Sequence, residues 1–147
     1  MTTPCIFCSI VAGQAEASVV HRDDLCLAFM DLHPVNPGHL LVVPLDHATY
    51  LADLPAATGA HMFTVAQQLA ASLRRSGLRA DGVNVFLADG EAAGQEVFHV
   101  HLHIIPRFAG DGFGLTFGPS YAQPVPRERL DREAAAIAAT KDDAHAG

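Results

Sequence analysis

The run His99-Val-His-Leu-His-Ile-Ile105 constrains the fold more than any other stretch of the chain. Imidazole and apolar side chains alternate in it, and successive side chains of a β-strand point to opposite faces of the sheet. We therefore expect a strand over residues 98–105, with the three histidines on one face and Val100, Leu102 and Ile104 in the core. A solvated polar face would explain the alternation but not the histidines, because Thr, Lys or Glu would serve there equally well.

The remaining pattern predicts a small α+β domain. Strands bounded by turn residues are expected at 18–20, 25–30, 39–43 and 82–87. A long helix is expected to begin at Pro55 and to end before Gly77, with apolar residues at helical spacing on one side: Met62, Val65, Ala66, Leu69 and Leu73. After Pro106 the chain is rich in glycine and proline as far as a second, alanine-rich helix at 127–140. Strands in hairpin-like order with one long helix predict a mostly antiparallel sheet with the helix packed across it.

The charge and the composition exclude two classes of partner. Nine Lys and Arg residues against 16 Asp and Glu residues give a net charge of −7, and binding of nucleic acid through its phosphates needs clustered cations. No apolar stretch approaches the ~20 residues of a membrane span, and the N-terminus lacks the basic segment and apolar run of a secretory signal. Three cysteines are a poor disulfide framework, so the chain is predicted to be cytoplasmic. The charge and the lack of a long apolar stretch predict that neither nucleic acid nor membrane is a partner.

The triad run and its flanks resemble the signature of the histidine triad (HIT) nucleotide hydrolases and transferases. Three further motifs carry the resemblance, which covers residues 4–108: Ala93-Gly-Gln95 with Pro106-Arg107 around the triad, Pro37-Gly-His-Leu-Leu-Val-Val-Pro44 with Asp31 upstream, and Cys5-Ile-Phe-Cys8 near the N-terminus. The resemblance implies a small antiparallel sheet crossed by one helix, in agreement with the pattern above.

The resemblance also implies how the chain is organised. Residues 1–108 are expected to form the HIT-like domain, and residues 109–147 a C-terminal extension with a helix, packed on that domain or part of it. Relatives are homodimers, and a bare sheet edge is a liability that proteins usually cover. We therefore expect a two-fold homodimer that extends the sheet, with the strand at 83–87 or at 99–105, or the helix face, buried between the copies.

Relatives act at the α-phosphate of a nucleotide, which implies a purine nucleotide or dinucleotide as the substrate here. The middle histidine, His101, would attack the phosphorus and form a covalent nucleotidyl-histidine that water then hydrolyses. An imidazole with an ordinary pKa of about 6.5 is largely neutral at pH 7, and the covalent step divides one difficult reaction into two. His103 would hold the phosphate oxygens, Gln95 would reach the phosphate and Asp31 would bind the ribose hydroxyls. The implied activity is hydrolysis of a phosphoramidate or phosphoanhydride bond, or nucleotidyl transfer.

The pair Cys5 and Cys8 has the spacing of half a zinc site. Two buried cysteines in a short helix would have the same spacing, and two donors do not close a tetrahedral site. The resemblance to bacterial zinc-binding members of the family supplies two more donors, His47 and His99, and implies a structural zinc. That assignment leaves the other two triad histidines without metal.

Two other functions remain open. The triad itself could hold a catalytic zinc, because His-x-His is a common metal pair, although the cysteine pair competes for His99. The chain could also be a nucleotide-binding regulator with little turnover, because Glu96 and Ala88 stand where relatives often carry Ser or Thr and Asn. Two histidines outside these motifs, His21 in a charged turn and His61 near the start of the long helix, are expected to be solvated.

Overall fold

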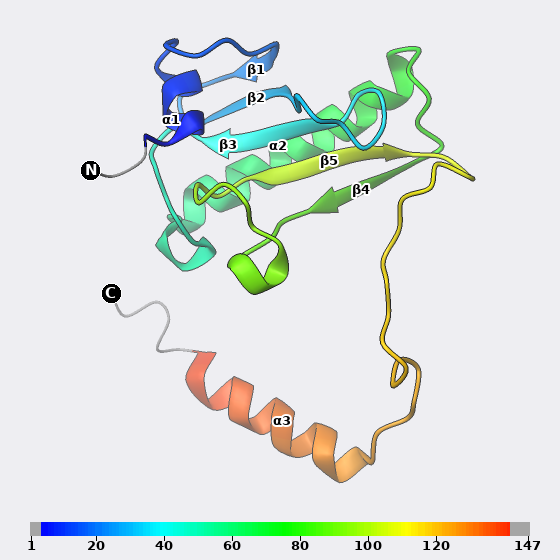
Figure 1. The fold of residues 1–147 in the computed structure, drawn as a ribbon. Helices are drawn as coiled ribbons and strands as arrows, with labels where there is room; N and C mark the ends of the chain where they lie inside the picture. The colour runs from blue at the N-terminus through cyan, green and yellow to red at the C-terminus, as the bar shows by residue number, and fades with distance from the viewer. Residues whose placement is uncertain (1–3, 142–147) are drawn as a thin grey trace. The chain divides into compact units, whose positions relative to one another are not determined.

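The computed structural model describes residues 4–141, and Figure 1 shows the elements along the chain. They are α1 (Ile6–Val11), β1 (Val19–Arg22), β2 (Cys26–Met30), β3 (Leu40–Pro44), α2 (Ala56–Arg75), β4 (Gly82–Phe86), β5 (Leu102–Arg107) and α3 (Arg127–Thr140), with short 3-10 helices at Leu51–Asp53 and Glu91–Ala93. The chain divides into two compact units, Met1–Gly112 and Phe113–Gly147. Within residues 4–141, no helix has the length and apolar character needed to cross a membrane.

The five strands form one antiparallel sheet in the order β1-β2-β3-β5-β4. Together with the long helix α2, this sheet confirms the α+β fold class. The strand β5 lies between β3 and β4, so of the two candidate edge strands only the one predicted at 83–87 is at an edge. The other expected edge, at 99–105, is wrong because this part of the chain pairs on both sides.

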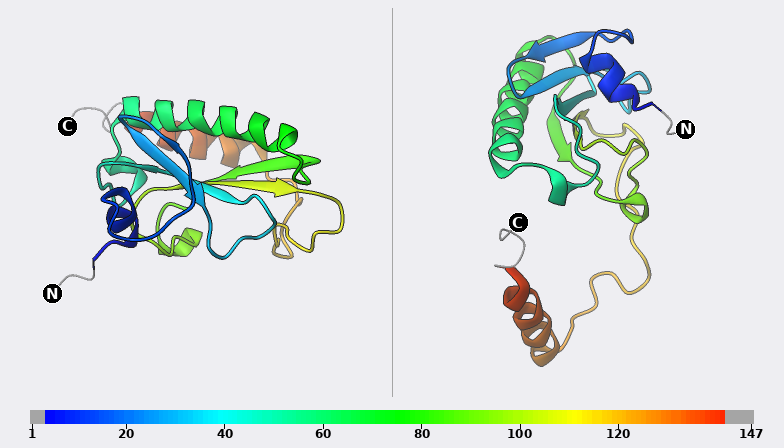
Figure 2. Two further views of the ribbon diagram at one scale, coloured as in Figure 1. Left: turned by 90° about the horizontal axis from the view of Figure 1, so that it is seen from above. Right: turned by 90° about the vertical axis from the view of Figure 1, so that its left-hand side faces the viewer.

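One helix covers each face of the sheet (Figure 2). The helix α2 packs on one face through the residues that its spacing predicted: Met62, Val65, Ala66, Leu69 and Leu73. The short helix α1 lies on the opposite face, where Phe7 packs with Leu27, Phe29, Leu41 and Val43. Each large side chain buried in this way contributes about 1.5–3 kcal/mol to folding. The triad histidines lie on the same face of the sheet as α1, where Phe7 contacts the rings of His99 and His101.

The strand β5 begins at Leu102. The alternating pattern predicted a start four residues earlier, at Phe98. Val42 pairs with Leu102, so Pro44 stands opposite Val100, and proline has no N–H to donate to the ladder. The N–H of Val100 bonds instead to the carbonyl oxygen of Ala48, at 2.8 Å. The alternation still holds through this irregular part, because Val100 belongs to the same buried cluster as the strand residues on the α2 side.

The second unit contains α3, which coincides with the helix predicted at 127–140. No side chain of this helix is buried, and Arg129 pairs with Glu133 one turn later, at 2.7 Å. In the segment before it, the rings of Phe117 and Tyr121 stack with their centroids 3.8 Å apart. How the extension packs on the first unit stays a prediction, and residues 142–147 of the predicted extension lie outside the described residues.

Candidate active site and metal centre

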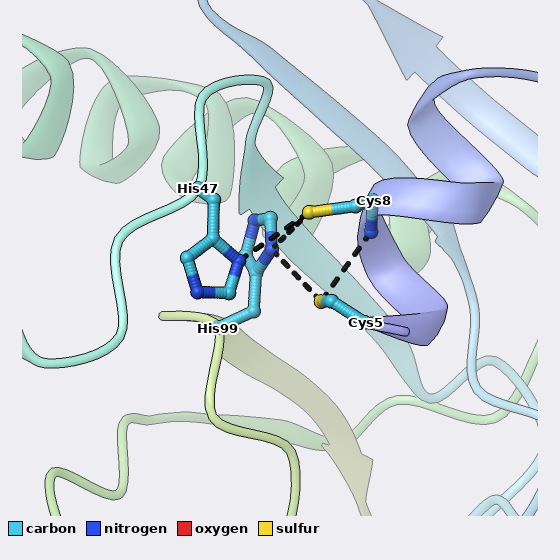
Figure 3. Close-up of side chains that lie close together, drawn as sticks. All are labelled: Cys5, Cys8, His47 and His99. Carbon is cyan, nitrogen blue, oxygen red and sulfur yellow. Dashed lines mark hydrogen bonds between the residues drawn. The ribbon is translucent and has the colours of Figure 1, made fainter. Parts of the chain in front are cut away.

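The structure brings together the four residues expected to hold a metal, Cys5, Cys8, His47 and His99 (Figure 3). The two cysteines come from the start of α1, and the two histidines from the loop after β3 and from the segment before β5. The ligand atoms of all four lie within 4.8 Å of one another. The Sγ of Cys5 is 3.4 Å from Nδ1 of His99, and the Sγ of Cys8 is 3.3 Å from Nδ1 of His47.

The hydrogen bonds around this cluster fit a bound cation. Nε2 of His99 donates to the carbonyl oxygen of Pro44 at 2.9 Å, so Nδ1, which faces the thiols, carries the lone pair. Burial, followed by the hydrogen bond and charge of Cys5, raises the pKa of the Cys8 thiol, and a cation would offset that penalty on the thiolate. Two thiols and two imidazoles are the donor set of a tetrahedral structural zinc site, so these residues fit zinc.

His101 lies on the α1 side of the sheet, next to this cluster. Phe7 of α1 meets its ring edge-on, with centroids 5.1 Å apart. Nδ1 of His101 donates to the carbonyl oxygen of His99 at 2.7 Å, which leaves the lone pair on Nε2. Burial lowers the pKa of His101 against the opposing effects of that carbonyl and of the carboxylates of Asp31 and Glu96. The ring is therefore a neutral imidazole with an available lone pair, the form in which histidine acts as a nucleophile.

His39, which lies outside the site expected from the sequence, sets the state of His103. The N–H of Val35 donates to Nδ1 of His39 at 3.0 Å, so the proton of His39 is on Nε2. That nitrogen donates to Nδ1 of His103 at 2.9 Å, so His103 carries its own proton on Nε2 and can donate it to a ligand. Burial, followed by the charges of His101 and His39, lowers the pKa of His103 to about 4. His103 is thus a neutral hydrogen-bond donor near pH 7.

Asp31 directly follows β2 and lies near the same two rings. Its Oδ2 is 3.4 Å from Nε2 of His39, and its Oδ1 accepts the backbone N–H of His33 at 2.8 Å. The carboxylate is partly open to solvent, at 18% of its side-chain surface. It is therefore held at the rim of the histidine group, where a ligand can still reach it.

Gln95 is buried, and its side-chain amide bonds to backbone groups of the surrounding loops. Its Oε1 accepts the N–H of Gly90 at 2.7 Å, and its Nε2 donates to the carbonyl oxygens of Thr49 and Val97 at 2.8 and 3.2 Å. These bonds tie the loop that contains Glu91–Ala93 to the segment before the triad. In this structure Gln95 holds that loop, and its expected contact with a phosphate stays a prediction.

His21 and His61 were expected to be solvated, and about a third of each side chain is exposed, but both rings also contact one carboxylate. Nε2 of His21 lies 2.7 Å, and Nε2 of His61 2.6 Å, from the same carboxylate oxygen, Oδ2 of Asp23. The sequence could not show the His61 contact, because the turn after β1 and the start of α2 are brought together only by the fold.

Comparisons with known proteins identify the relatives of this chain. The family model for the HIT domain matches residues 12–110. An uncharacterized HIT-like protein from Mycobacterium tuberculosis is 40% identical over 136 residues, which are 90% of this chain and 94% of the relative. The crystal structure of a HIT family protein from Bacillus anthracis has a TM-score of 0.86 at 36% identity and covers 95% of this chain and 99% of its own.

A further solved structure bears on the metal centre. It is the Zn-bound histidine triad family protein from Mycobacterium smegmatis, which is 41% identical, has a TM-score of 0.72 and covers 96% of this chain and 97% of its own. The family match over most of the first unit, the relatives that match over almost their whole length and the shared fold lead to one conclusion. The chain belongs to the histidine triad (HIT) family.

Proposed function

We propose that the chain is a nucleotide hydrolase or nucleotidyl transferase that acts at the α-phosphate through a covalent nucleotidyl-histidine at His101. One observation carries this proposal: the Nδ1 proton of His101 is bonded to a carbonyl oxygen, so the lone pair is on Nε2 of a neutral ring. Family membership supports nucleotide chemistry, and a solved structure with a TM-score of 0.81 at 25% identity is a histidine triad nucleotide-binding protein from Candida albicans. The test is to trap the labelled intermediate on the wild type and on His101→Asn.

In the first step, Nε2 of His101 forms a bond to phosphorus while the bond to the leaving group breaks. The leaving group departs with the electron pair, an amine leaving group also takes a proton from water, and the imidazole becomes positively charged. The carbonyl oxygen of His99 then accepts a hydrogen bond from a cationic ring and stabilises it. In the second step, water attacks the phosphorus, the bond from nitrogen to phosphorus breaks, and Nε2 regains its lone pair while the water proton passes to solvent.

The neighbouring residues have separate roles in this proposal. The Nε2 proton of His103 donates to a phosphate oxygen, which stabilises negative charge as the transition state forms. Asp31 accepts hydrogen bonds from the ribose hydroxyls of a purine nucleotide or dinucleotide, and its partial exposure leaves room for them. Gln95 holds the loop beside the triad. We propose that the protein is located in the cytoplasm.

The metal is proposed to be one structural zinc ion, held by Cys5, Cys8, His47 and His99. When bound, it cross-links α1, the loop after β3 and the segment before β5 that carries His99. A catalytic zinc on the triad is less well supported, because Nε2 of His99 is committed to Pro44 and Nδ1 faces the thiols. His101 and His103 remain available to the nucleotide.

We also propose a homodimer in which β4 and the neighbouring face of α2 meet their copies. The strand β4 is a sheet edge, and its residues Val85 and Phe86 are about two fifths exposed, while Phe63 on α2 is 54% exposed. An open edge beside exposed apolar side chains is a surface that proteins cover. We expect light scattering at micromolar concentration to give about twice the chain mass of 15.5 kDa.

Phe63→Asp tests this interface, with Val20→Asp on the opposite sheet edge as the matched control. Val20 has a similar exposure, 48%, so both variants place a carboxylate on a half-exposed position. Only Phe63→Asp is expected to shift the mass towards the monomer. A monomer mass for the wild type would contradict the dimer.

His39→Leu is expected to lower kcat about tenfold, which corresponds to loss of one hydrogen bond of ~1.5 kcal/mol in the transition state. Leucine cannot donate to Nδ1 of His103, so the proton of that ring is no longer held on Nε2. Nitrogen NMR of the imidazole shows directly which ring nitrogen carries the proton. His39→Gln, which keeps an amide donor, should restore part of the rate, and an unchanged His103 tautomer in His39→Leu would contradict the assignment.

A further inference from the structure

A second group of potential metal ligands lies apart from the triad and from the cysteine pair. The turn after β1 carries Asp23, which is flanked by His21 on β1 and by Cys26 on β2. Their ligand atoms lie within 4.8 Å of one another. His61 reaches the same carboxylate from α2, with its Nε2 2.6 Å from Oδ2 of Asp23. Two imidazoles and a thiol, from β1, α2 and β2, therefore converge on one carboxylate oxygen, Oδ2 of Asp23.

The carboxylate is held in place by its other oxygen. Oδ1 of Asp23 accepts the backbone N–H groups of Leu25 and Cys26, each at 2.9 Å. Burial raises the pKa of Asp23, but the hydrogen bonds from His21, His61 and these two N–H groups outweigh it and hold the pKa well below its usual range. Asp23 is thus ionised near neutral pH, and its second oxygen faces the two rings.

The two rings can change from proton donors to ligands without loss of another bond. Within residues 4–141, Nδ1 of neither His21 nor His61 has a hydrogen-bond partner, so the ring proton can move to Nδ1 and expose the Nε2 lone pair. About a third of each imidazole is exposed, 31% and 36%, so an ion from solvent can reach the point between them.

Cys26 closes the inner side of this group. It is fully buried, and its Sγ is 3.8 Å from Oδ2 of Asp23. Burial, followed by the charge and the hydrogen bond of Asp23, raises the pKa of this thiol to about 12, so it is a proton donor while no ion is present. A coordinated metal ion removes the proton from a thiol, and the ion would then have sulfur, oxygen and two nitrogen donors.

We propose that His21, Asp23, Cys26 and His61 form a second binding site for a divalent transition-metal ion such as zinc. Imidazole and thiolate donors select zinc and its neighbours over magnesium and calcium, which prefer oxygen. A bound ion would tie the β1–β2 turn to α2, two parts of the fold that the Asp23–His61 contact already joins. The site does not depend on the proposed chemistry of the triad.

The test is the number of zinc ions bound by the full chain after chelation and dialysis against zinc in a reducing buffer. We expect the wild type to bind one ion more than His21→Gln and one more than Cys26→Val. Both variants should fold, because His21 is partly exposed and valine replaces a small buried side chain with an apolar one. His33→Gln, which removes an exposed imidazole elsewhere, is the matched control and should bind as many ions as the wild type.

Each other result has a definite meaning. Equal zinc content in the wild type, His21→Gln and Cys26→Val overturns the proposal. A second ion lost in His103→Asn instead belongs to the Asp31, His39 and His103 group, and this also overturns it. If the cysteine-pair site binds no zinc, Cys8→Ser keeps the single ion that His21→Gln loses, so failure of the structural zinc and failure of this second site are distinguishable.

Discussion

His101→Asn is expected to reduce turnover of a nucleoside phosphoramidate by more than about 10²-fold, the smallest loss that removal of acid–base help alone produces. Asparagine can keep the hydrogen bond to the carbonyl oxygen of His99, because its amide nitrogen takes the place of Nδ1. It has no counterpart of the Nε2 lone pair and cannot form the bond to phosphorus. Nucleotide binding should persist, because His103 and Asp31 are unchanged.

The covalent intermediate separates this mechanism from the other functions. A nucleotide labelled at the α-phosphate, quenched rapidly in alkaline denaturant where phosphorus–nitrogen bonds survive, should leave label on the wild type and none on His101→Asn. His103→Asn is the matched control: it loses a donor to the phosphate but keeps the nucleophile, so it should retain a trace of activity and of label. More than about a hundredth of the wild-type rate in His101→Asn would show that His101 is not the nucleophile.

The fold could be predicted from the sequence wherever one local rule decided the structure. The spacing of Met62, Val65 and Leu69 predicted the buried side of α2, because a helix places such residues on one face. The start of β5 could not be predicted in this way. It depends on Pro44, which stands opposite Val100 only once β3 and β5 have paired in their register.

In the candidate site, too, some features could be predicted from the sequence and others could not. The spacing of the two cysteines and the resemblance were enough to name Cys5, Cys8, His47 and His99, which the fold brings together. The role of His39 could not be predicted, because it rests on a proton that the backbone N–H of Val35 places on one ring nitrogen. Its only signal was its position after the Pro37-Gly38 turn, at the start of a buried strand.

Removal of zinc is expected to lower the melting temperature by more than about 10 °C. Structural zinc sites supply apparent binding free energies of ~10–16 kcal/mol, which is comparable to the ~5–15 kcal/mol by which a whole domain is stable. Loss of even ~3 kcal/mol in a domain of this size shifts the melting temperature by roughly 10 °C. The ion would join α1 to His99 in the segment just before His101 (Figure 3), so unfolding should begin there.

Chelation would empty both proposed metal sites, so variants must assign the loss of stability. Cys8→Ser and His47→Gln each remove one donor of the cysteine-pair site and should each lower both zinc content and melting temperature. His33→Gln removes an imidazole without touching either cluster and should change neither. Because the metal is assigned to holding the segment before His101 rather than to the phosphate, folded Cys8→Ser at low temperature should still form the labelled intermediate. An unchanged melting temperature after complete removal of zinc would contradict the structural role.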